Sequence, residues 1–318
     1  MINKITEDNT ILSDEKIDFG AISSDTNGKG LYRTSDLDRN DDLDRDGEGE
    51  EVLYFRGAVT NNYLVFADFC WRIVRTNEDG SVKLRYGGVP TVIGETYICS
   101  QTGTSVGIND NTLYKFNNIN TSTQYVGYTF STSNADSIAK STIETGYRDN
   151  IANKSDALTS LIEDTIYCND RTVSGMVNNI TYYGAYERLM NNKKPQYKCP
   201  QETDKYTLKI ANGGTGGYGN NLLEYPVGLL TADEISFAGG KCDENNSSYY
   251  LYTNISSWTM SPYYYGGSVA FIFFVATGDY LHIGNVSNQT ALIPVISLKS
   301  TSTVIKGTGN YNDPYIIG

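Results

Sequence analysis

The first third of the chain alternates between short apolar runs and turn residues, which predicts antiparallel strands. Strand patterns rich in aromatic residues and Val cover residues 52–59, 63–67, 69–76 and 81–86. Asn61-Asn62 separates the first two patterns, and 77–80 (Asn-Glu-Asp-Gly) separates the last two; both are turn signals. We therefore expect a series of antiparallel hairpins.

The middle of the chain carries helical signals. Residues 136–151 place apolar side chains at a helical spacing, and residues 182–190 form a second, shorter helix candidate. Thr231 and Glu234 match a capping box, in which the Thr hydroxyl and the Glu carboxylate satisfy each other's open backbone amides. The helix expected at 232–238 ends at Gly239-Gly240.

Strand patterns return in the last third of the chain, at 269–277, 280–284 and 292–299. Strands first, helices in the middle and strands last predict an α+β fold whose terminal strands pair with each other. Residues 1–30 are polar with scattered Ile and Leu, so we expect an N-terminal tether or edge segment. A single ligand-binding domain is expected at 31–299, followed by an extended segment at 300–318.

The composition narrows the range of functions. The chain has 318 residues, with 25 Lys+Arg against 37 Asp+Glu and a formal net charge of -12. We therefore expect neither nucleic acid nor a polyanionic membrane surface as a partner, and no apolar stretch is long enough to insert into a membrane. His282 is the single His, and no nucleophile can be placed beside it from sequence. The 26 Tyr, in a chain also rich in Asn, Gly and Ser, are typical of antigen-binding surfaces.

Five cysteines bear on the redox compartment. They form no Cys-x-x-Cys pair, and no His lies near them in sequence, which argues against a zinc site. Cys168 and Cys199 flank a predicted helix and either form a disulfide or remain as two buried thiols. The odd count leaves at least one cysteine unpaired or in an intermolecular bond. The polar N-terminus has no signal-peptide pattern, so we expect either a cytoplasmic protein or a chain from which an anchor was removed.

Two groups of motifs resemble a known family. The first runs from Tyr54 to Tyr63 (YFRGAVTNNY) and continues through 71–74 (WRIV) to 79–84 (DGSVKL). The second comprises 225–234 (YPVGLLTADE), 258–262 (WTMSP), 293–299 (IPVISLK) and 312–315 (NDPY). Over about residues 31–318 the chain is similar to uncharacterised, surface-anchored proteins of gut Bacilli. Its C-terminal third resembles the variable proteins of diversity-generating retroelements.

The resemblance implies a C-type-lectin-like fold over 31–299, with antiparallel strands, two or three helices and long loops. In the variable proteins, a Trp-x-x-Ser segment precedes a hypervariable stretch that closes with an Arg-Pro-Val strand. Trp258 and Ser261 match the start of this pattern. The closing motif has Ile293 before Pro294-Val295, so any hydrogen bonds of the usual Arg are absent or replaced. The Glu-Pro-Asn, Gln-Pro-Asp and Trp-Asn-Asp triplets of calcium-dependent lectins do not occur.

A diversified binding surface is expected near residues 263–292. Side chains alternate between the two faces of a strand, so we expect Phe271, Phe273 and Val275 to point into the core. The outward-facing residues are then Ser268, Ala270, Ile272 and Phe274, with Tyr280 and His282 on the same face. The flanking loops add Tyr263, Tyr264, Tyr265, Asn285, Ser287, Asn288 and Gln289. The alternative is a strand buried on both faces, which explains the apolar run at 269–274 equally well.

An acidic segment offers one candidate metal site. Asp42, Asp44, Asp46 and Glu48 match the first half of an EF-hand calcium loop. The twelfth position, however, is Leu53 instead of a bidentate Glu. A solvated hairpin tip is therefore the favoured interpretation; no cofactor is expected, and calcium is the one candidate ion.

These observations favour a non-enzymatic, extracellular or cell-surface binding protein, such as an adhesin or receptor. Its expected ligand is a protein or glycan on another cell or phage. The alternative is a structural or pilus-associated surface domain. An enzyme ranks third, either of the formylglycine-generating type, which shares the lectin-like fold, or a glycoside hydrolase with two carboxylates. Trp71 and Trp258 are expected to be core anchors.

Overall fold

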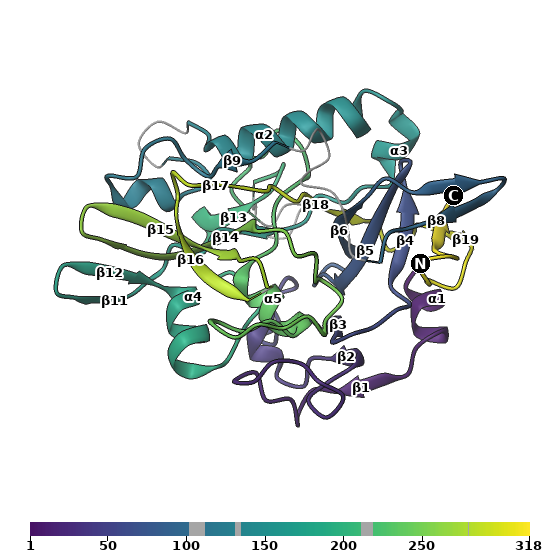
Figure 1. Cartoon of the computed structure of the whole chain (residues 1–318), viewed down its shortest axis with the longest axis horizontal. Coiled ribbons are helices and arrows are strands. Elements are labelled where there is room, and N and C mark those ends of the chain that lie inside the picture. The colour runs from purple at the N-terminus through teal and green to yellow at the C-terminus, as the bar shows by residue number, and fades with distance from the viewer. Residues whose placement is uncertain (102–111, 131–134, 211–218, 279) are drawn as a thin grey trace.

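The computed structural model describes residues 1–101, 112–130, 135–210, 219–278 and 280–318. Sheets and short helices form an α+β fold, as the order of the sequence patterns predicted. A nine-stranded sheet lies on one side of the molecule and a five-stranded sheet on the other, with helix α2 (Ile138–Tyr147) along the top (Figure 1). Within these residues, no helix combines the length and apolar character needed to cross a membrane.

The nine-stranded sheet contains strands from both ends of the chain. Its order is β1-β2-β3-β5-β4-β20-β19, and β6 pairs with both β5 and β18. Strand β18 runs antiparallel to β6, and β20 runs parallel to β4, which confirms that the terminal strands pair. The strands are β1 (Ile11–Ser13), β2 (Gly30–Arg33), β3 (Leu53–Arg56), β4 (Tyr63–Phe66), β5 (Phe69–Thr76), β6 (Val82–Gly88), β18 (Val295–Leu298), β19 (Val304–Lys306) and β20 (Tyr315–Ile317).

The strand order corrects the hairpin predicted between residues 52–59 and 63–67. Strand β5 lies between β3 and β4, so these two strands are not paired with each other. Asn62 is held by β5 instead: Ile73 N donates to Asn62 O at 2.8 Å, and Asn62 Nδ2 donates to Ile73 O at 2.8 Å. The predicted hairpin of β5 and β6 forms.

The five-stranded sheet is antiparallel throughout, in the order β11-β12-β14-β15-β16. Its strands are β11 (Val173–Val177), β12 (Ile180–Tyr183), β14 (Ser257–Gly266), β15 (Val269–Val275) and β16 (Leu281–Asn285). We expected residues 263–265 in a loop, but they belong to the ten-residue strand β14. Register shifts on both sides of Pro262 interrupt the alternation of β14, which is why its sequence lacks a regular strand pattern.

The remaining elements are short. Three two-stranded sheets pair β7 (Thr91–Ile93) with β8 (Thr96–Ile98), β9 (Tyr114–Lys115) with β17 (Gln289–Thr290), and β10 (Tyr167–Cys168) with β13 (Lys205–Tyr206). The remaining helical segments are α1 (Ile2–Glu7), η1 (Leu37–Arg39), η2 (Thr123–Val126), η3 (Arg148–Ala152), α3 (Asp156–Ser160), α4 (Gly184–Tyr186), η4 (Glu187–Asn192), η5 (Glu202–Asp204) and α5 (Ala232–Ala238).

The three predicted helices form, with one boundary shifted. Helix α2 continues into the π-helix η3 and so covers most of 136–151. In the second predicted helix, at 182–190, Tyr182 and Tyr183 belong to strand β12, and helix α4 begins only at Gly184. The capping box of α5 is confirmed: Thr231 Oγ1 accepts from Glu234 N at 3.1 Å, and Glu234 Oε2 accepts from Thr231 N at 2.9 Å.

One large hydrophobic core joins the two sheets. Trp71 is fully buried and Trp258 is 3% exposed, so both are core anchors as expected. Each indole also finds an acceptor: Trp71 Nε1 donates to Phe66 O at 3.0 Å, and Trp258 Nε1 donates to Tyr114 O at 2.9 Å. Burying an indole with its N–H bonded avoids the cost of an unpaired polar group.

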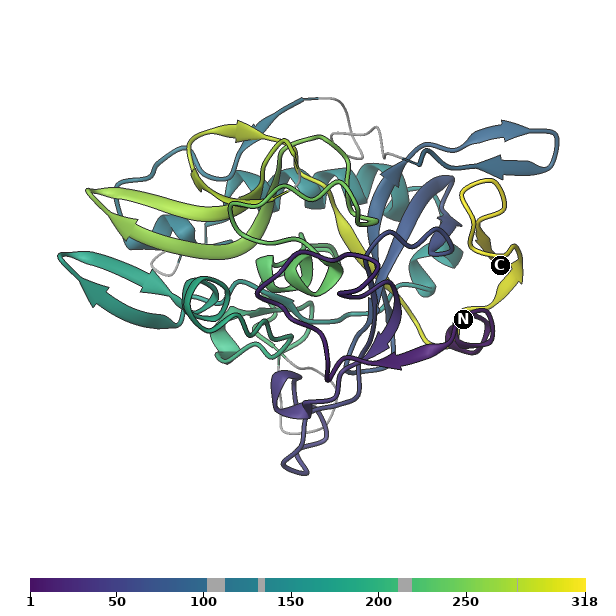
Figure 2. The same ribbon diagram turned by 60° about the horizontal axis from the view of Figure 1, so that its bottom comes forward.

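The first 30 residues and the last 19 pack onto the body of the molecule. The Met1 amino group donates to Ser302 O at 2.6 Å, and Tyr315 Oη donates to Asp8 Oδ2 at 2.8 Å. Ile5 enters the main core. The two ends of the chain lie side by side (Figure 2), and the nine-stranded sheet crosses both expected domain boundaries, at 30 and at 299.

Four of the five cysteines are paired. Cys168 and Cys199 form the disulfide that the sequence left open between a bond and two thiols. Cys70 and Cys99, which the sequence did not pair, form a second disulfide with a Cα–Cα distance of 5.8 Å. Cys242 is a free thiol. The pairing of Cys70 depends on the packing of the 99–101 segment beside β4 and β5, which has no local sequence signal.

Candidate functional site

Strand β15 carries the centre of the expected binding surface, and its exposure differs from the prediction. Ala270 and Ile272 are fully buried, so the expectation that they point outward is wrong. Phe273 and Val275, on the opposite face, are buried too, while Phe271 is half-exposed. The strand therefore has buried side chains on both faces; β14 and β16 flank it within the sheet, and η2 packs against it from outside the sheet. This is the alternative that the apolar run at 269–274 left open.

Half-exposed aromatic side chains lie on the face of the five-stranded sheet that is opposite to Ala270 and Ile272. The strand register aligns Tyr182 of β12 with Tyr264 of β14, Tyr264 with Phe271 of β15, and Phe271 with Asn285 of β16. All four side chains are half-exposed. We call the aromatic group formed by Tyr182, Tyr186, Tyr263, Tyr264 and Phe271 the tyrosine surface. It contains Tyr263 and Tyr264, which were expected at the site, and the new members Tyr182, Tyr186 and Phe271.

Contacts between rings hold the tyrosine surface in place. The ring centroids are 4.2 Å apart for Tyr182 and Tyr186, 5.1 Å for Tyr186 and Tyr263, and 5.3 Å for Tyr263 and Tyr264. Tyr264 also lies 5.9 Å from Tyr182 and 4.6 Å from Phe271. Apart from the closest pair, Tyr182 and Tyr186 at 4.2 Å, these separations are in the range of favourable aromatic pairs, roughly 4.5–7 Å. The rings therefore form a continuous, pre-ordered contact surface.

The pKa values of the Tyr186, Tyr263 and Tyr264 phenols are raised, so these three groups are neutral at physiological pH. Burial, together with the neighbouring Tyr186, raises the pKa of Tyr263, and burial beside Tyr182 raises the pKa of Tyr264. Burial also raises the pKa of Tyr186. A neutral phenol can donate or accept a hydrogen bond, so the surface offers both ring contacts and adaptable polar contacts.

The remaining expected residues lie around the ends of β14–β16. Tyr265 Oη donates to Thr121 O at 2.9 Å, which directs this side chain away from the tyrosine surface. Ser287 N and Oγ both donate to Asn285 Oδ1, at 3.0 and 2.9 Å. Asn288 is exposed in the turn that follows β16, Gln289 is exposed on β17, and Ser268 is exposed at the tip of the β14–β15 hairpin.

His282 lies at the opposite end of the sheet, with Phe274 and Tyr280 beside it. Its ring centroid is 5.9 Å from that of Phe274 and 5.6 Å from that of Tyr280, and its Nδ1 is 2.9 Å from Asp243 Oδ1. A small cavity of about 50 Å³ between His282 and Tyr263 also contacts Cys242. Burial, followed by the charge of Asp243, raises the pKa of the Cys242 thiol to about 12. A catalytic cysteine needs the reverse shift, so the surroundings of Cys242 do not activate its thiol.

The acidic loop forms a smaller cluster than the sequence predicted. Ligand atoms of Asp42, Asp44 and Glu50 lie within 4.8 Å of one another. Asp46 and Glu48 are outside this group, and Asp46 Oδ1 accepts from Glu48 N at 2.9 Å instead. Glu50 is the ninth position of the EF-hand spacing, a ligand position that the sequence interpretation did not use. Calcium binding at this loop stays a prediction.

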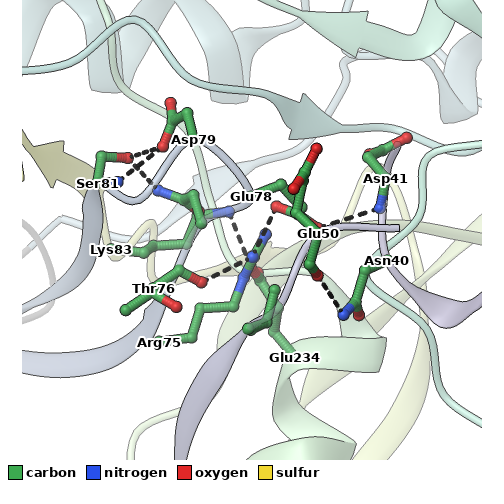
Figure 3. Close-up of polar contacts among 12 residues, drawn as sticks. Asn40, Asp41, Glu50, Arg75, Thr76, Glu78, Asp79, Ser81, Lys83 and Glu234 are labelled. Atoms are coloured by element: carbon green, nitrogen blue, oxygen red, sulfur yellow. Dashed lines mark hydrogen bonds and ion pairs between the residues drawn. The ribbon is translucent and has the colours of Figure 1, made fainter. Parts of the chain in front are cut away.

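A buried ionic cluster connects helix α5 to the nine-stranded sheet (Figure 3). Glu234 Oε1 accepts from Lys83 Nζ at 2.8 Å and from Arg75 Nε at 3.0 Å, and Arg75 Nη1 donates to Glu78 Oε2 at 2.9 Å. Burial by itself raises the pKa of Glu234, but the charges of Lys83 and Arg75 lower it to about 2. Because its carboxylates are neutralised by adjacent cations, we assign this cluster a structural role.

Comparisons with known proteins give no relative. No protein-family model matches the chain, and no curated protein or solved structure matches it significantly.

Proposed function

We propose that this chain is a non-enzymatic, extracellular binding protein that uses the tyrosine surface to contact a protein or glycan on another cell or a phage. The observation that carries the proposal is the half-exposed aromatic row that crosses strands β12, β14 and β15, with Asn285 of β16 at its end. Large aromatic side chains supply much of the binding energy in protein interfaces.

The ordering of the rings favours binding. A tyrosine has few rotatable bonds, and here its neighbours already restrict them through ring contacts of 4.2 to 5.9 Å. Little side-chain entropy is therefore lost when a partner covers the surface. Asn285 and Ser287 add polar groups at its margin, in keeping with the mixed aromatic and polar character of antibody-like contact surfaces.

We further propose that the scaffold is of the C-type-lectin type and that residues 258–292 are the diversified segment of a retroelement variable protein. In support, this segment supplies Tyr263, Tyr264 and Phe271 to the tyrosine surface. Ile293, which replaces the usual Arg, is 4% exposed and lies in the main core, so apolar packing takes the place of that side chain's hydrogen bonds. A nearby reverse-transcriptase gene and a second copy of the coding segment that differs at adenines would support this part; their absence contradicts it.

An extracellular location is supported by the disulfides. Bonds at Cys70–Cys99 and Cys168–Cys199 persist in oxidising compartments and are rare in the cytosol.

The alternative of a structural or pilus-associated domain has one observation in its favour. Strand β11 is an edge strand of the five-stranded sheet, and its side chains Val173, Met176 and Val177 are 53%, 71% and 58% exposed. Exposed apolar edge strands can pair with another chain. This alternative predicts concentration-dependent assembly in analytical ultracentrifugation that Met176→Lys abolishes.

The binding proposal is tested with intact bacterial cells, phage particles and immobilised glycans as probes. We expect Tyr182→Ser and Tyr264→Ser each to weaken binding by about ten-fold or more to whichever of these probes the wild-type protein binds. Tyr97→Ser is the matched control, because Tyr97 is a half-exposed tyrosine on β8, outside the tyrosine surface. Circular dichroism verifies that all three variants are folded. Unchanged binding of Tyr182→Ser and Tyr264→Ser contradicts the proposal.

A further inference from the structure

A cavity lined by aromatic side chains lies against the nine-stranded sheet. It has no residue in common with the tyrosine surface. Its volume is about 390 Å³, and a narrower cavity of about 10 Å³ adjoins it, lined in part by residues of β4, β5 and β6. The two cavities share Tyr63, Arg72, Gln101, Tyr250 and Tyr252 among their lining residues. A volume of this size is typical of small-molecule sites.

Arg72 forms the charged part of this cavity. Its side chain is 6% exposed and lies 3.7 Å from the ring centroid of Tyr63 and 5.2 Å from that of Tyr250. Nη2 donates to Val59 O at 3.1 Å and to Asn62 Oδ1. Nε is buried without a hydrogen-bond partner. Within the described parts of the chain, no carboxylate forms an ion pair with Arg72.

Other buried arginines of the protein are better compensated. Arg75 and Arg188 pair with carboxylates, at 2.9 Å to Glu78 and 2.7 Å to Asp170. Arg56 has no carboxylate partner among the described residues, but it donates to four backbone carbonyls through Nε, Nη1 and Nη2. Burial lowers the pKa of Arg72 to about 10, so the guanidinium is still charged at neutral pH.

A second unsatisfied polar group lies in the same cavity. Tyr250 is 6% exposed, and its Oη has no hydrogen-bond partner. Buried polar groups in folded proteins are nearly always hydrogen-bonded, and each exception calls for an explanation. Arg72 and Tyr250 both line this cavity, so one acceptor entering between the two side chains would satisfy both groups.

We propose that this cavity binds a small ring-bearing carboxylate, which accepts hydrogen bonds from Arg72 Nε and Tyr250 Oη. A planar carboxylate matches the geometry of a guanidinium edge and is a strong, charge-assisted acceptor. It also supplies the counter-charge that Arg72 lacks. The walls formed by Tyr63, Tyr252 and Tyr311 present aromatic rings to the body of the ligand, which favours a flat or cyclic molecule.

Aromatic acids and acidic sugars both have this chemistry, and titration calorimetry distinguishes them. The probes are phenylacetate and glucuronate, with phenylacetamide and glucose as their neutral counterparts. We expect one acid to bind and its neutral counterpart to bind at least about ten-fold more weakly, because the charge-assisted bonds are lost. The proposal is overturned if neither acid binds at millimolar concentration, or if a neutral counterpart binds as well as its acid.

The variant Tyr250→Phe tests the assignment of the site. It removes only a hydroxyl that has no partner in the protein, so we expect the melting temperature to stay the same or rise. The affinity for the acid should fall by about ten-fold or more. Tyr128→Phe is the matched control, because the Tyr128 hydroxyl is also buried and unpartnered but packs against Phe116 and Tyr206, away from the cavity.

The two variants separate the possible results. Loss of affinity in Tyr250→Phe but not in Tyr128→Phe supports the site. Equal affinity of Tyr250→Phe and the wild type overturns it, whatever the behaviour of the tyrosine surface. Tyr182→Ser and Tyr264→Ser are expected to bind the acid normally, so failure of the two proposals can be told apart.

Discussion

Lys83 Nζ lies 2.8 Å from Glu234 Oε1, deep between the nine-stranded sheet and helix α5. Glu234 is also the third residue of α5 and closes its capping box with Thr231. Oε2 of this carboxylate therefore accepts the capping hydrogen bond at the start of the helix. Oε1 accepts from Arg75 of β5 and Lys83 of β6 and so binds the helix to the sheet. The helix start and its position on the sheet depend on the same side chain.

Substitution of this carboxylate is expected to be costly. Glu234→Gln leaves Lys83 and Arg75 buried with less counter-charge, and we expect the free energy of unfolding to fall by about 3–5 kcal/mol. Urea denaturation measures the change. Glu51→Gln is the control, since the Arg33–Glu51 pair is half-exposed on both sides and should cost less than about 1 kcal/mol. Equal effects of the two substitutions would contradict a structural role for the cluster.

Stability should depend on pH in two opposite ways. Burial and the nearby Glu78 raise the pKa of Asp41 from 3.8 to about 6. The folded state therefore binds the proton more tightly than the unfolded state, and the unfolding free energy rises by about 2–3 kcal/mol as pH falls from 7 to 4. The lowered pKa of Glu234 has the opposite sign, because its stabilisation is lost as pH falls from 4.5 towards 2.

The variant Asp41→Asn isolates the first of these effects. Glu144, Asp164 and Asp204 also have raised pKa values because of burial, so the wild type alone does not identify Asp41. We expect the unfolding free energy of Asp41→Asn to vary less between pH 4 and 7 than that of the wild type. Below pH 4.5 it should still decrease, because Glu234 becomes protonated there. Identical pH profiles of the two proteins would rule out the assignment.

The disulfides should stabilise the fold separately. The bonds Cys70–Cys99 and Cys168–Cys199 close segments with sequence separations of 29 and 31. We expect each double Cys→Ala variant to lose about 2–4 kcal/mol of unfolding free energy in urea. Alkylation of the unreduced, denatured protein followed by mass spectrometry should label Cys242 alone. Labelling of any other cysteine contradicts the pairing.

Burial on β15 can be tested against exposure on β11. Ile272 is fully buried, so Ile272→Ala should lower the unfolding free energy by about 2–5 kcal/mol. Met176 is 71% exposed, and Met176→Ala should change the unfolding free energy by less than about 0.5 kcal/mol. A small effect at Ile272 would restore the outward-facing orientation that alternation predicted.

Sequence patterns were reliable where the structure depends on neighbours along the chain. The bounds of β5 and α5 agree with the pattern, because a regular apolar spacing and a capping box are local properties. The strand β14 was missed, since register shifts around Pro262 break the alternation that identifies a strand. The tyrosine surface was therefore only partly predicted: Tyr263 and Tyr264 were named, but Tyr182 was assigned to a helix and Phe271 to the core.

By itself, the sequence determined the α+β class, the pairing of the terminal strands, the helix α5 with its cap, and the general region of the aromatic residues. Only the tertiary structure decided that β5 separates β3 from β4, that Ala270 and Ile272 face the core, and that Arg72 is buried with no carboxylate partner in the part of the chain that the structure describes. The reason is physical. Periodicity shows that two faces of a strand differ, but which face is covered, and which charge finds a partner, depends on segments distant in sequence that fold against it.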